Sequence, residues 1–237
     1  MTQIVALVQA RMGSSRFPGK MLELLGDFPL LEWVLRRSCQ SKKVNTVVLA
    51  TTDQSGDDSL VSLAARLGVP VFRGSEKDVL GRFSEAANQH NADIVVRVCA
   101  DNPFIDPREI DRLVTYFEEE PCDYACNHQD RLGSDYADGF GAEILSNALL
   151  QTITNQVDDP QYREHVTLYL WEHPDQYQLC SVPAPPALAF PDLRFDVDTY
   201  IDLNALQVLV DMGIDIGSPA EKIIDIKRNH ETYHHGL

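Results

Sequence analysis

The sequence predicts an α/β fold in which a mostly parallel sheet is covered by helices on both faces. Two observations lead to this prediction. Short apolar runs, each ending abruptly at polar residues, recur at residues 4–8, 44–50, 69–72 and 93–99. Each run is followed by a stretch whose apolar residues have helical spacing. Strands that alternate with helices in this way are typical of parallel sheets joined by crossover helices.

The stretches between the runs predict helices of ordinary length. Within residues 22–39, Leu30, Leu31, Val34 and Leu35 lie on one helical face. The other helices are predicted over residues 59–67, 79–90 and 110–117, and Gly68 ends the first of these.

Residues 121–193 break the alternation, because Gly, Asp, Tyr and Pro become frequent there. A strand that continues as a helix is expected over 142–153, a helix over 164–171 and a short strand over 180–182. We interpret this section as an inserted subdomain within a single domain of residues 1–237. The alternation resumes with a strand over 193–198, a helix over 200–212 and a last helix near Ser218.

The chain has 237 residues and a formal net charge of -16. This acidic balance argues against binding to nucleic acid or to anionic membranes. We expect no signal peptide, because the chain leads straight into its first apolar run without a basic segment. No apolar run approaches the roughly 20 residues of a membrane span. Its five scattered cysteines fit reduced thiols. A cytoplasmic protein is expected.

The loop after the first apolar run is cationic, with Arg11, Arg16 and Lys20 and no acid before Glu23. Open α/β sheets bind ligands where their strands end. We therefore interpret residues 10–20, called the cradle loop below, as a phosphate-binding loop. The alternative is a solvated surface loop with scattered charges.

The small residues of the cradle loop support the phosphate interpretation. Gly13 lets the backbone approach an anion, and Ser14 and Ser15 add hydrogen-bond donors. The loop is not a Walker motif, because Met21 follows Lys20, and its glycines do not have dinucleotide-fold spacing.

Carboxylates follow two of the predicted strands. Asp196 and Asp198 are two residues apart, so on an extended strand they share a face and repel each other unless a cation compensates them. Oxygen ligands of this kind suit Mg²⁺. Asp101 ends the run at 93–99. The alternatives are that Asp198 caps the helix beginning near Thr199, and that Asp101 is a turn residue before Pro103.

The pattern R-x-G-S-x-R-x-P-x-K over residues 11–20 resembles the nucleotide-binding signature of sugar nucleotidyltransferases, in particular cytidylyltransferases. The chain is similar to the spore-coat polysaccharide biosynthesis group, and to enzymes that make CMP-3-deoxy-manno-octulosonate and CMP-sialic acid. The resemblance implies a Rossmann-like fold of the nucleotide-diphospho-sugar transferase type. It also implies a reaction of CTP with a sugar, an acidic one in these relatives, that yields CMP-sugar and pyrophosphate for polysaccharide or glycan biosynthesis.

The same resemblance implies roles for individual residues and a homodimer formed through residues 121–193. Arg16, Lys20 and Asp101 would be catalytic, and Asp101, Asp196 and Asp198 would hold Mg²⁺ or Mn²⁺. Glu143 and His165 would lie on the sugar side; the alternatives are an exposed rim carboxylate and a structural histidine. The implied nucleotide-binding residues are Gln9, Ala10, Arg11, Gly13, Ser14, Ser15, Arg16, Lys20, Asp53, Arg73, Ser75 and Asp101.

Two other functions fit parts of the sequence. A nucleotide-sugar-dependent glycosyltransferase also carries a D-x-D element, although normally in mid-chain and without such a cradle loop. A non-catalytic nucleotide-binding protein would need the loop but not the metal-binding carboxylates.

Overall fold

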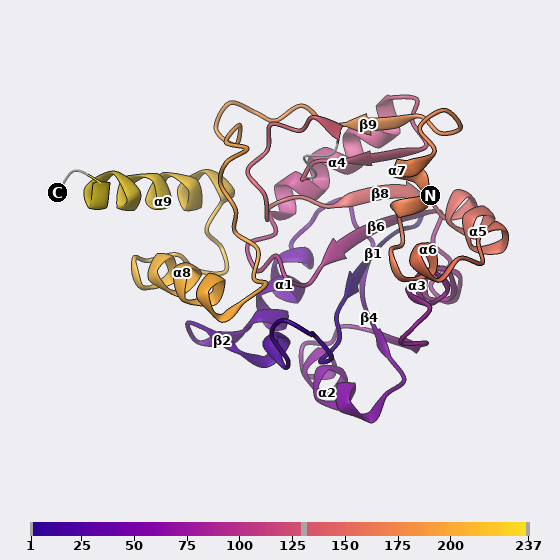
Figure 1. The fold of residues 1–237 in the computed structure, drawn as a ribbon, viewed down its shortest axis with the longest axis horizontal. Coiled ribbons are helices and arrows are strands. Elements are labelled where there is room, and N and C mark those ends of the chain that lie inside the picture. Colours follow the sequence, from indigo (N-terminus) through magenta and orange to yellow (C-terminus); the bar gives the residue numbers. More distant parts are fainter. Residues whose placement is uncertain (1, 129–131, 236–237) are drawn as a thin grey trace.

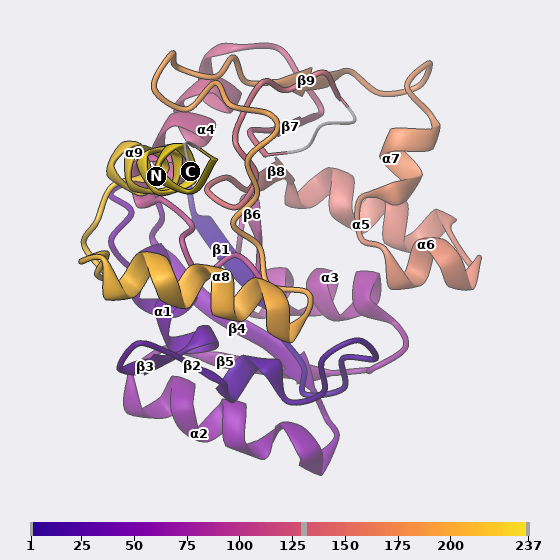
Figure 2. The ribbon, with the colours of Figure 1, turned by 60° about the vertical axis from the view of Figure 1, so that its left-hand side comes forward.

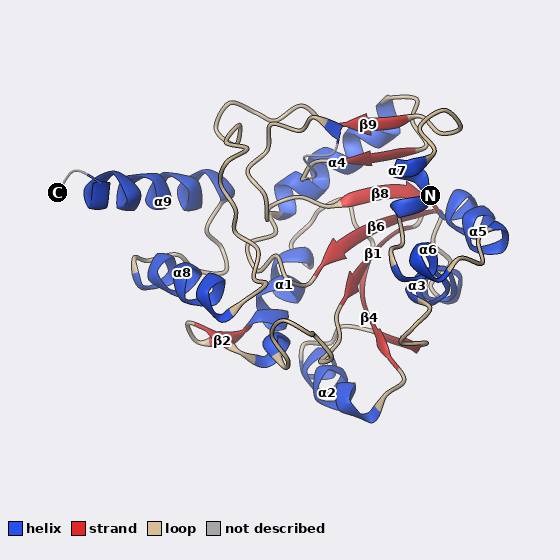
Figure 3. Ribbon diagram, in the orientation of Figure 1, coloured by secondary structure: helices blue, strands red, loops and turns tan. Residues whose placement is uncertain are grey.

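The computed structural model describes residues 2–128 and 132–235. Among these, one mostly parallel sheet has the strand order β5-β4-β1-β6-β8-β7-β9 (Figures 1 and 3). β4, β5 and β6 run parallel to β1, whereas β8 is antiparallel to both of its neighbours. The predicted fold class is confirmed. The strands are β1 Ile4–Gln9, β4 Thr46–Thr52, β5 Val71–Gly74, β6 Ile94–Cys99, β7 Tyr124–Cys126, β8 Glu143–Ser146 and β9 Leu179–Ser181.

Helices cover both faces of this sheet. On one face, apolar residues of the strands pack against α1 Leu30–Ser38, α2 Asp58–Arg66 and α4 Pro107–Glu119. On the other face they pack against α3 Val79–Gln89, α5 Asn147–Gln156 and the segment containing α6 Pro160–Glu164 and α7 Leu168–Glu172. Figure 2 shows α5, α6 and α7 together on one side of the molecule.

A third apolar cluster lies beside the sheet. It joins Trp33 of α1 and Phe195 to a two-stranded hairpin, β2 Leu24–Leu25 and β3 Phe28–Pro29, and to α8 Tyr200–Asp211 and α9 Ala220–His235. The hairpin is absent from the sequence prediction, because its strands are too short to show an alternating pattern. α9 extends away from the body of the molecule (Figure 1).

Residues 121–193 contribute β7, β8 and β9 to the main sheet. The strand expected to continue as a helix over 142–153 is confirmed as β8 followed by α5. The continuous helix predicted over 164–171 is wrong. The chain leaves the helical conformation at His165 (φ −111°, ψ 91°), which separates α6 from α7.

The strand predicted over 193–198 is also wrong, although its alternation is preserved. Phe195 and Val197 are buried, while the aspartates beside them remain partly exposed. The segment is held by an isolated bridge between Arg194 and Asp138 and by a 2.8 Å hydrogen bond from the Val197 N–H to the Asp101 carbonyl. The segments that pair with residues 193–198 are loops, so no continuous ladder of strand hydrogen bonds forms there.

The topology creates a crevice at the ends of β1 and β6. The chain leaves β1 for β4 and β5 and then returns to β6 on the other side of β1. Loops that diverge at the carboxyl ends of neighbouring parallel strands leave a ligand-binding crevice between them. None of the described helices combines the length and the apolar character that crossing a membrane requires.

Candidate active site

The cradle loop leaves β1 and closes on itself. The N–H groups of Ser14 and Gly19 both donate to the Met12 carbonyl, at 2.9 and 3.0 Å, and the Phe17 N–H donates to the Ser14 hydroxyl at 3.2 Å. Gly19 has φ 79°, a left-handed conformation that favours glycine. The turn that delivers Lys20 to the crevice therefore depends on Gly19.

Asp57 fixes the start of the cradle loop. Its carboxylate, only 3% exposed, accepts the Met12 N–H at 2.8 Å and the hydroxyls of Thr51 and Thr52. Burial would raise the pKa of Asp57, but these hydrogen bonds lower it below its usual value. An ionised carboxylate thus ties the loop to the end of β4. The sequence analysis missed this residue, because it chose Asp53 in the same turn.

A cavity of about 260 Å³ opens between the cradle loop and the end of β6. The structure brings most of the predicted nucleotide-binding residues to this cavity, together with Asp198 from the other end of the chain. Its lining consists of Gln9, Ala10, Arg11, Ser14, Ser15, Arg16, Lys20, Met21, Arg97, Cys99, Ala100, Asp101 and Asp198.

Lys20 is the central charge of this cavity. Its residue is 8% exposed, and its Nζ donates to the Val197 carbonyl at 2.7 Å. The same Nζ lies 3.8 Å from Asp101 Oδ2 and 3.6 Å from Asp198 Oδ1. Arg16 is exposed and pairs with the other oxygen of Asp198 at 2.7 Å. Two cations of the cradle loop therefore lie beside Asp101 and Asp198, which come from distant parts of the sequence.

Asp101 is held in an environment that disfavours its charge. Burial raises the pKa of Asp101 above its usual value; Lys20 opposes the shift, and Asp198 and Asp196 add to it. The neutral form of Asp101 is therefore favoured more than in a free carboxyl group.

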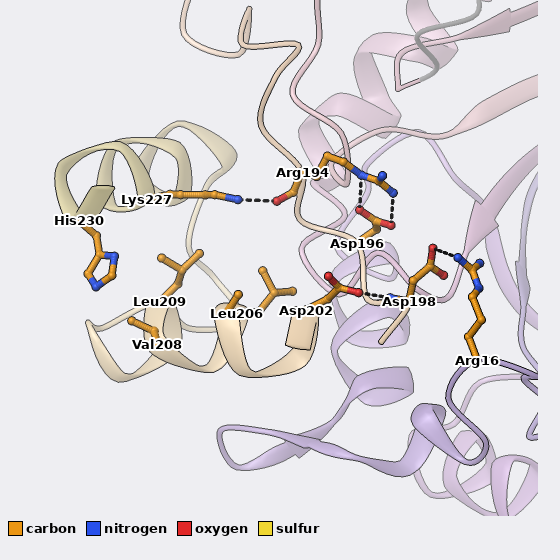
Figure 4. A pocket seen from close by; sticks show the side chains of 11 residues that line it. Arg16, Arg194, Asp196, Asp198, Asp202, Leu206, Val208, Leu209, Lys227 and His230 are labelled. Atoms are coloured by element: carbon orange, nitrogen blue, oxygen red, sulfur yellow. Dashed lines mark hydrogen bonds and ion pairs between the residues drawn. The ribbon is translucent and has the colours of Figure 1, made fainter. Parts of the chain in front are cut away.

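The helix-cap alternative for Asp198 is wrong. Thr199 is the N-cap of α8, and it forms a capping box with Asp202. The Asp198 side chain is thus left for Arg16 and Lys20. Asp196 is engaged differently, since Arg194 donates to its two oxygens at 3.0 and 2.6 Å (Figure 4).

The carboxylates around Lys20 provide only some of the ligands that a divalent cation needs. Among the described residues, no group of three His, Cys, Asp or Glu side chains is arranged to hold a metal ion. Asp101 and Asp198 nevertheless both approach Lys20 Nζ, and hard oxygen ligands of this kind suit Mg²⁺ or Mn²⁺. Asp196 could join them only after leaving Arg194.

Four predicted nucleotide-binding residues lie outside this cavity. The Arg73 guanidinium donates hydrogen bonds to the Thr52 and Gln54 carbonyls and to the Asp58 carboxylate. The other three are Gly13, Asp53 and Ser75. A Cβ added at Gly13 would lie 3.4 Å from Glu76 Oε1. The Asp53 carboxylate accepts a hydrogen bond from the Gln54 side chain, and the Ser75 hydroxyl accepts one from the Asp78 N–H.

Glu143 is not an exposed rim carboxylate, because it is 0% exposed. It forms an ion pair with Arg97 and lies 3.5 Å from His128 Nε2. Burial would raise the pKa of Glu143, but Arg97 and His128 lower it to about 2. Burial opposes the charge of His128, yet Asp138 and Glu143 raise the pKa of His128 to about 9.

The sequence analysis named Glu143 but missed its partners Arg97 and His128. A signal for Arg97 existed, since it interrupts an otherwise apolar strand. His128 had none. His165 is exposed at the end of α6 and lines a separate cavity.

A larger cavity than the cradle cavity, about 500 Å³, lies between α8 and α9 and shares Arg16 and Asp198 with it (Figure 4). Its wall on α8 is mostly apolar, with Leu206, Val208 and Leu209, and Lys227 comes from α9. It adjoins the polar centre without containing Lys20 or Asp101. We therefore take the cradle cavity as the candidate active site.

A cationic loop at the end of β1 faces Asp101, which follows the parallel strand β6, and Asp198. This arrangement is typical of nucleotide-binding α/β proteins. The sequence profile of the cytidylyltransferase family matches residues 5–236. The chain belongs to this family and is a nucleotidyltransferase. This membership sets aside the glycosyltransferase and the non-catalytic nucleotide-binding protein.

Individual relatives agree with this membership. The chain is 35% identical over 213 residues to the spore coat polysaccharide biosynthesis protein SpsF of Bacillus subtilis, covering 88% of this chain and 87% of that protein. It is 32% identical over 202 residues to a 3-deoxy-manno-octulosonate cytidylyltransferase of Solibacter usitatus, covering 78% and 77%. A cytidylyltransferase structure from Leptospira borgpetersenii superimposes with a TM-score of 0.91 at 29% identity, covering 98% and 96%.

Proposed function

We propose that the protein transfers a cytidylyl group from CTP to an acidic sugar. A sugar hydroxyl attacks the α-phosphorus of CTP, the bond to the bridging oxygen breaks, and pyrophosphate leaves. The products are the CMP-sugar and pyrophosphate, and the hydroxyl proton is released. The observation that carries the proposal is the meeting of Lys20 with Asp101 and Asp198 beside the cradle loop.

The side chains divide the work of binding and charge stabilisation. The cradle loop, with Arg16 and the hydroxyls of Ser14 and Ser15, faces the cavity and offers donors to the triphosphate. Lys20 stabilises negative charge that develops as pyrophosphate departs. Asp101 lines the same cavity, 3.8 Å from Lys20 Nζ, and its carboxylate serves the divalent cation described next.

Asp101 and Asp198 are the residues that would hold a divalent metal ion in this proposal, with Asp196 as a further candidate. A bound Mg²⁺ supplies charge neutralisation at the phosphate. The acidic sugar is proposed from the cytidylyltransferase relatives, and the polysaccharide role from the SpsF relative. The scattered cysteines and the CTP substrate support a cytoplasmic location.

CTP should stabilise the protein more than UTP, ATP or GTP. A ligand that binds only the native state raises its stability, so the nucleotide with the highest affinity gives the largest shift in melting temperature. The measurement is thermal unfolding with each nucleotide and Mg²⁺, followed by pyrophosphate release from CTP with acidic and neutral sugars. A larger shift with a purine nucleotide would remove the assignment of CTP.

We also propose a two-fold homodimer. The sequence placed its interface in residues 121–193. The large apolar side chains that the structure exposes are instead concentrated on α8, where Ile201, Val208 and Met212 share one face and Ile201 is 78% exposed. A second copy of the chain packed on α8 would cover this face, which continues into the groove beside α9.

Light scattering at micromolar concentration should therefore give the mass of two chains. Ile201→Glu should return the mass of one chain, because it places a charge in the apolar interface. Gln89→Glu, which adds a charge at an exposed position of α3, is the control and should stay dimeric. A monomer in the unsubstituted protein contradicts the proposal.

A further inference from the structure

The Asp57 carboxylate joins the cradle loop to the end of β4, and each of its oxygens contacts one of the two segments. Oδ1 accepts the Met12 N–H at 2.8 Å. Oδ2 accepts the hydroxyls of Thr51 and Thr52 and, at 3.2 Å, the Thr52 N–H. The carboxylate therefore holds the loop with one oxygen and the strand with the other.

Met12 is the residue on which the cradle loop closes. Its carbonyl accepts the Ser14 N–H at 2.9 Å and the Gly19 N–H at 3.0 Å. Gly19 immediately precedes Lys20, so the start and the end of the loop both depend on the orientation of Met12. Because Asp57 holds the N–H of the same residue, it acts on a loop whose cavity it does not line.

The closed loop leaves part of its backbone available to a ligand. Within the described part of the chain, the N–H groups of Gly13, Ser15 and Arg16 have no hydrogen-bond partner, and all three residues are exposed. N–H groups that lie close together in a turn bind anions when the turn fixes their directions. Their directions depend on how Met12 is held, and thus on Asp57.

Asp57 keeps its charge at a buried position. Burial raises the pKa of Asp57, but the hydrogen bonds that it accepts lower this pKa below its usual value. The buried guanidinium of Arg82 adds a favourable charge interaction. An ionised carboxylate can only accept hydrogen bonds, so it fixes the direction of the N–H and hydroxyl groups around it. A charge at this position favours a positioning role over the filling of space.

We propose that Asp57 is a positioning residue for the triphosphate: through Met12 it holds the cradle loop in the conformation that binds the phosphates of CTP. This inference rests on the proposed cytidylyl transfer and assigns part of the nucleotide affinity to a side chain outside the cavity. Without the Oδ1 contact the Met12 peptide is free to turn, and the turn that delivers Lys20 loses its fixed acceptor.

The test compares the affinities of CTP and CMP, measured by titration calorimetry at one Mg²⁺ concentration without an acceptor sugar. The unsubstituted protein should bind CTP more tightly than CMP, by about tenfold or more, because the two further phosphates add charged hydrogen bonds. Asp57→Ala should reduce this ratio by about tenfold, since a loop that is not held makes these bonds less well. The affinity for CMP should stay close to that of the unsubstituted protein.

Two variants separate the loop contact from overall stability. Asp57→Asn keeps an oxygen for the Met12 N–H, and threonine hydroxyls can accept from its amide group, so it should restore most of the ratio. Thr51→Val is the matched control, because it removes a hydroxyl that donates to Oδ2 and leaves the Oδ1 contact. It should lower the melting temperature and leave the CTP-to-CMP ratio unchanged. If Asp57→Ala fails to fold, Asp57→Ser replaces it, since its side chain is one bond shorter and does not reach the Met12 N–H.

The outcomes separate the inference from the function on which it rests. An unchanged CTP-to-CMP ratio in folded Asp57→Ala or Asp57→Ser overturns the inference, as does equal affinity of the unsubstituted protein for CTP and CMP. The same holds if Thr51→Val lowers the ratio as far as Asp57→Ala, or if Asp57→Asn does not restore it, because the loss then does not follow the Met12 contact. In these cases cytidylyl transfer itself stands. Absence of pyrophosphate release from CTP with every sugar overturns the proposed function, and the inference with it.

Discussion

Lys20→Ala should lower turnover by roughly two to three orders of magnitude, the range reported when one preorganised charge-stabilising donor is removed. Lys20 Nζ contacts Asp101, Asp198 and the Val197 carbonyl from a buried position. In the proposed reaction, its removal takes away the cation that faces the departing pyrophosphate. It also leaves two neighbouring carboxylates without their shared counter-charge, so their repulsion opposes the incoming triphosphate.

Steady-state kinetics with CTP check this prediction, with Arg16→Ala for comparison. Arg16 is exposed and contacts only the outer oxygen of Asp198, so its loss should cost about tenfold to a hundredfold in kcat/KM. The matched control is Lys43→Ala, which removes a lysine paired with Glu118 on the surface and should leave turnover unchanged. Near-normal kinetics in Lys20→Ala would move the phosphate site elsewhere.

Asp101→Asn should abolish most turnover while making the protein more stable at neutral pH. The amide keeps the shape of the side chain but cannot neutralise a bound cation. Burial and the neighbouring aspartates raise the pKa of Asp101 in the folded state above its usual value of 3.8. The folded state therefore binds this proton more tightly than the unfolded state, and deprotonation of Asp101 costs stability.

The sign of the pH dependence follows from this raised pKa. Below about pH 4 the carboxyl is protonated in both the folded and the unfolded state, so Asp101→Asn and the unsubstituted protein should melt at similar temperatures. As the pH rises through the folded pKa, the unsubstituted protein loses stability that the amide variant keeps.

Melting temperatures of both proteins from pH 4 to pH 8 measure the difference. The control is Asp175→Asn, which removes an exposed carboxylate and should change neither stability nor turnover. An active Asp101→Asn enzyme, or one that is less stable at pH 8 than at pH 4 relative to the unsubstituted protein, would contradict the role given to Asp101.

The contrast between Asp196 and Asp198 shows what an alternating sequence pattern cannot predict. Both carboxylates face the same side because Phe195 and Val197 are buried, as the alternation predicts. Their partners differ, however, since Arg194 takes Asp196 while Arg16 and Lys20 take Asp198. Alternation specifies a face, but it contains no information about which distant side chain arrives there.

The sequence by itself determined the α/β class, the helices and strands of the sheet's first half, and the cationic loop after β1. Each of these depends on local periodicity or on residues close together in the chain, which is why a single sequence shows them. The spacing of Asp196 and Asp198 suggested a metal site, and the family resemblance favoured that role over the helix cap and led us to expect a reaction with CTP.

Only the tertiary structure decided which of these groups meet. It placed Asp57 instead of Asp53 beside the cradle loop, turned Arg73 away from the cavity, and buried Glu143 between Arg97 and His128. Such contacts join residues far apart in the chain, and their energies depend on burial and on the nearest opposite charge. Neither quantity exists until the chain has folded.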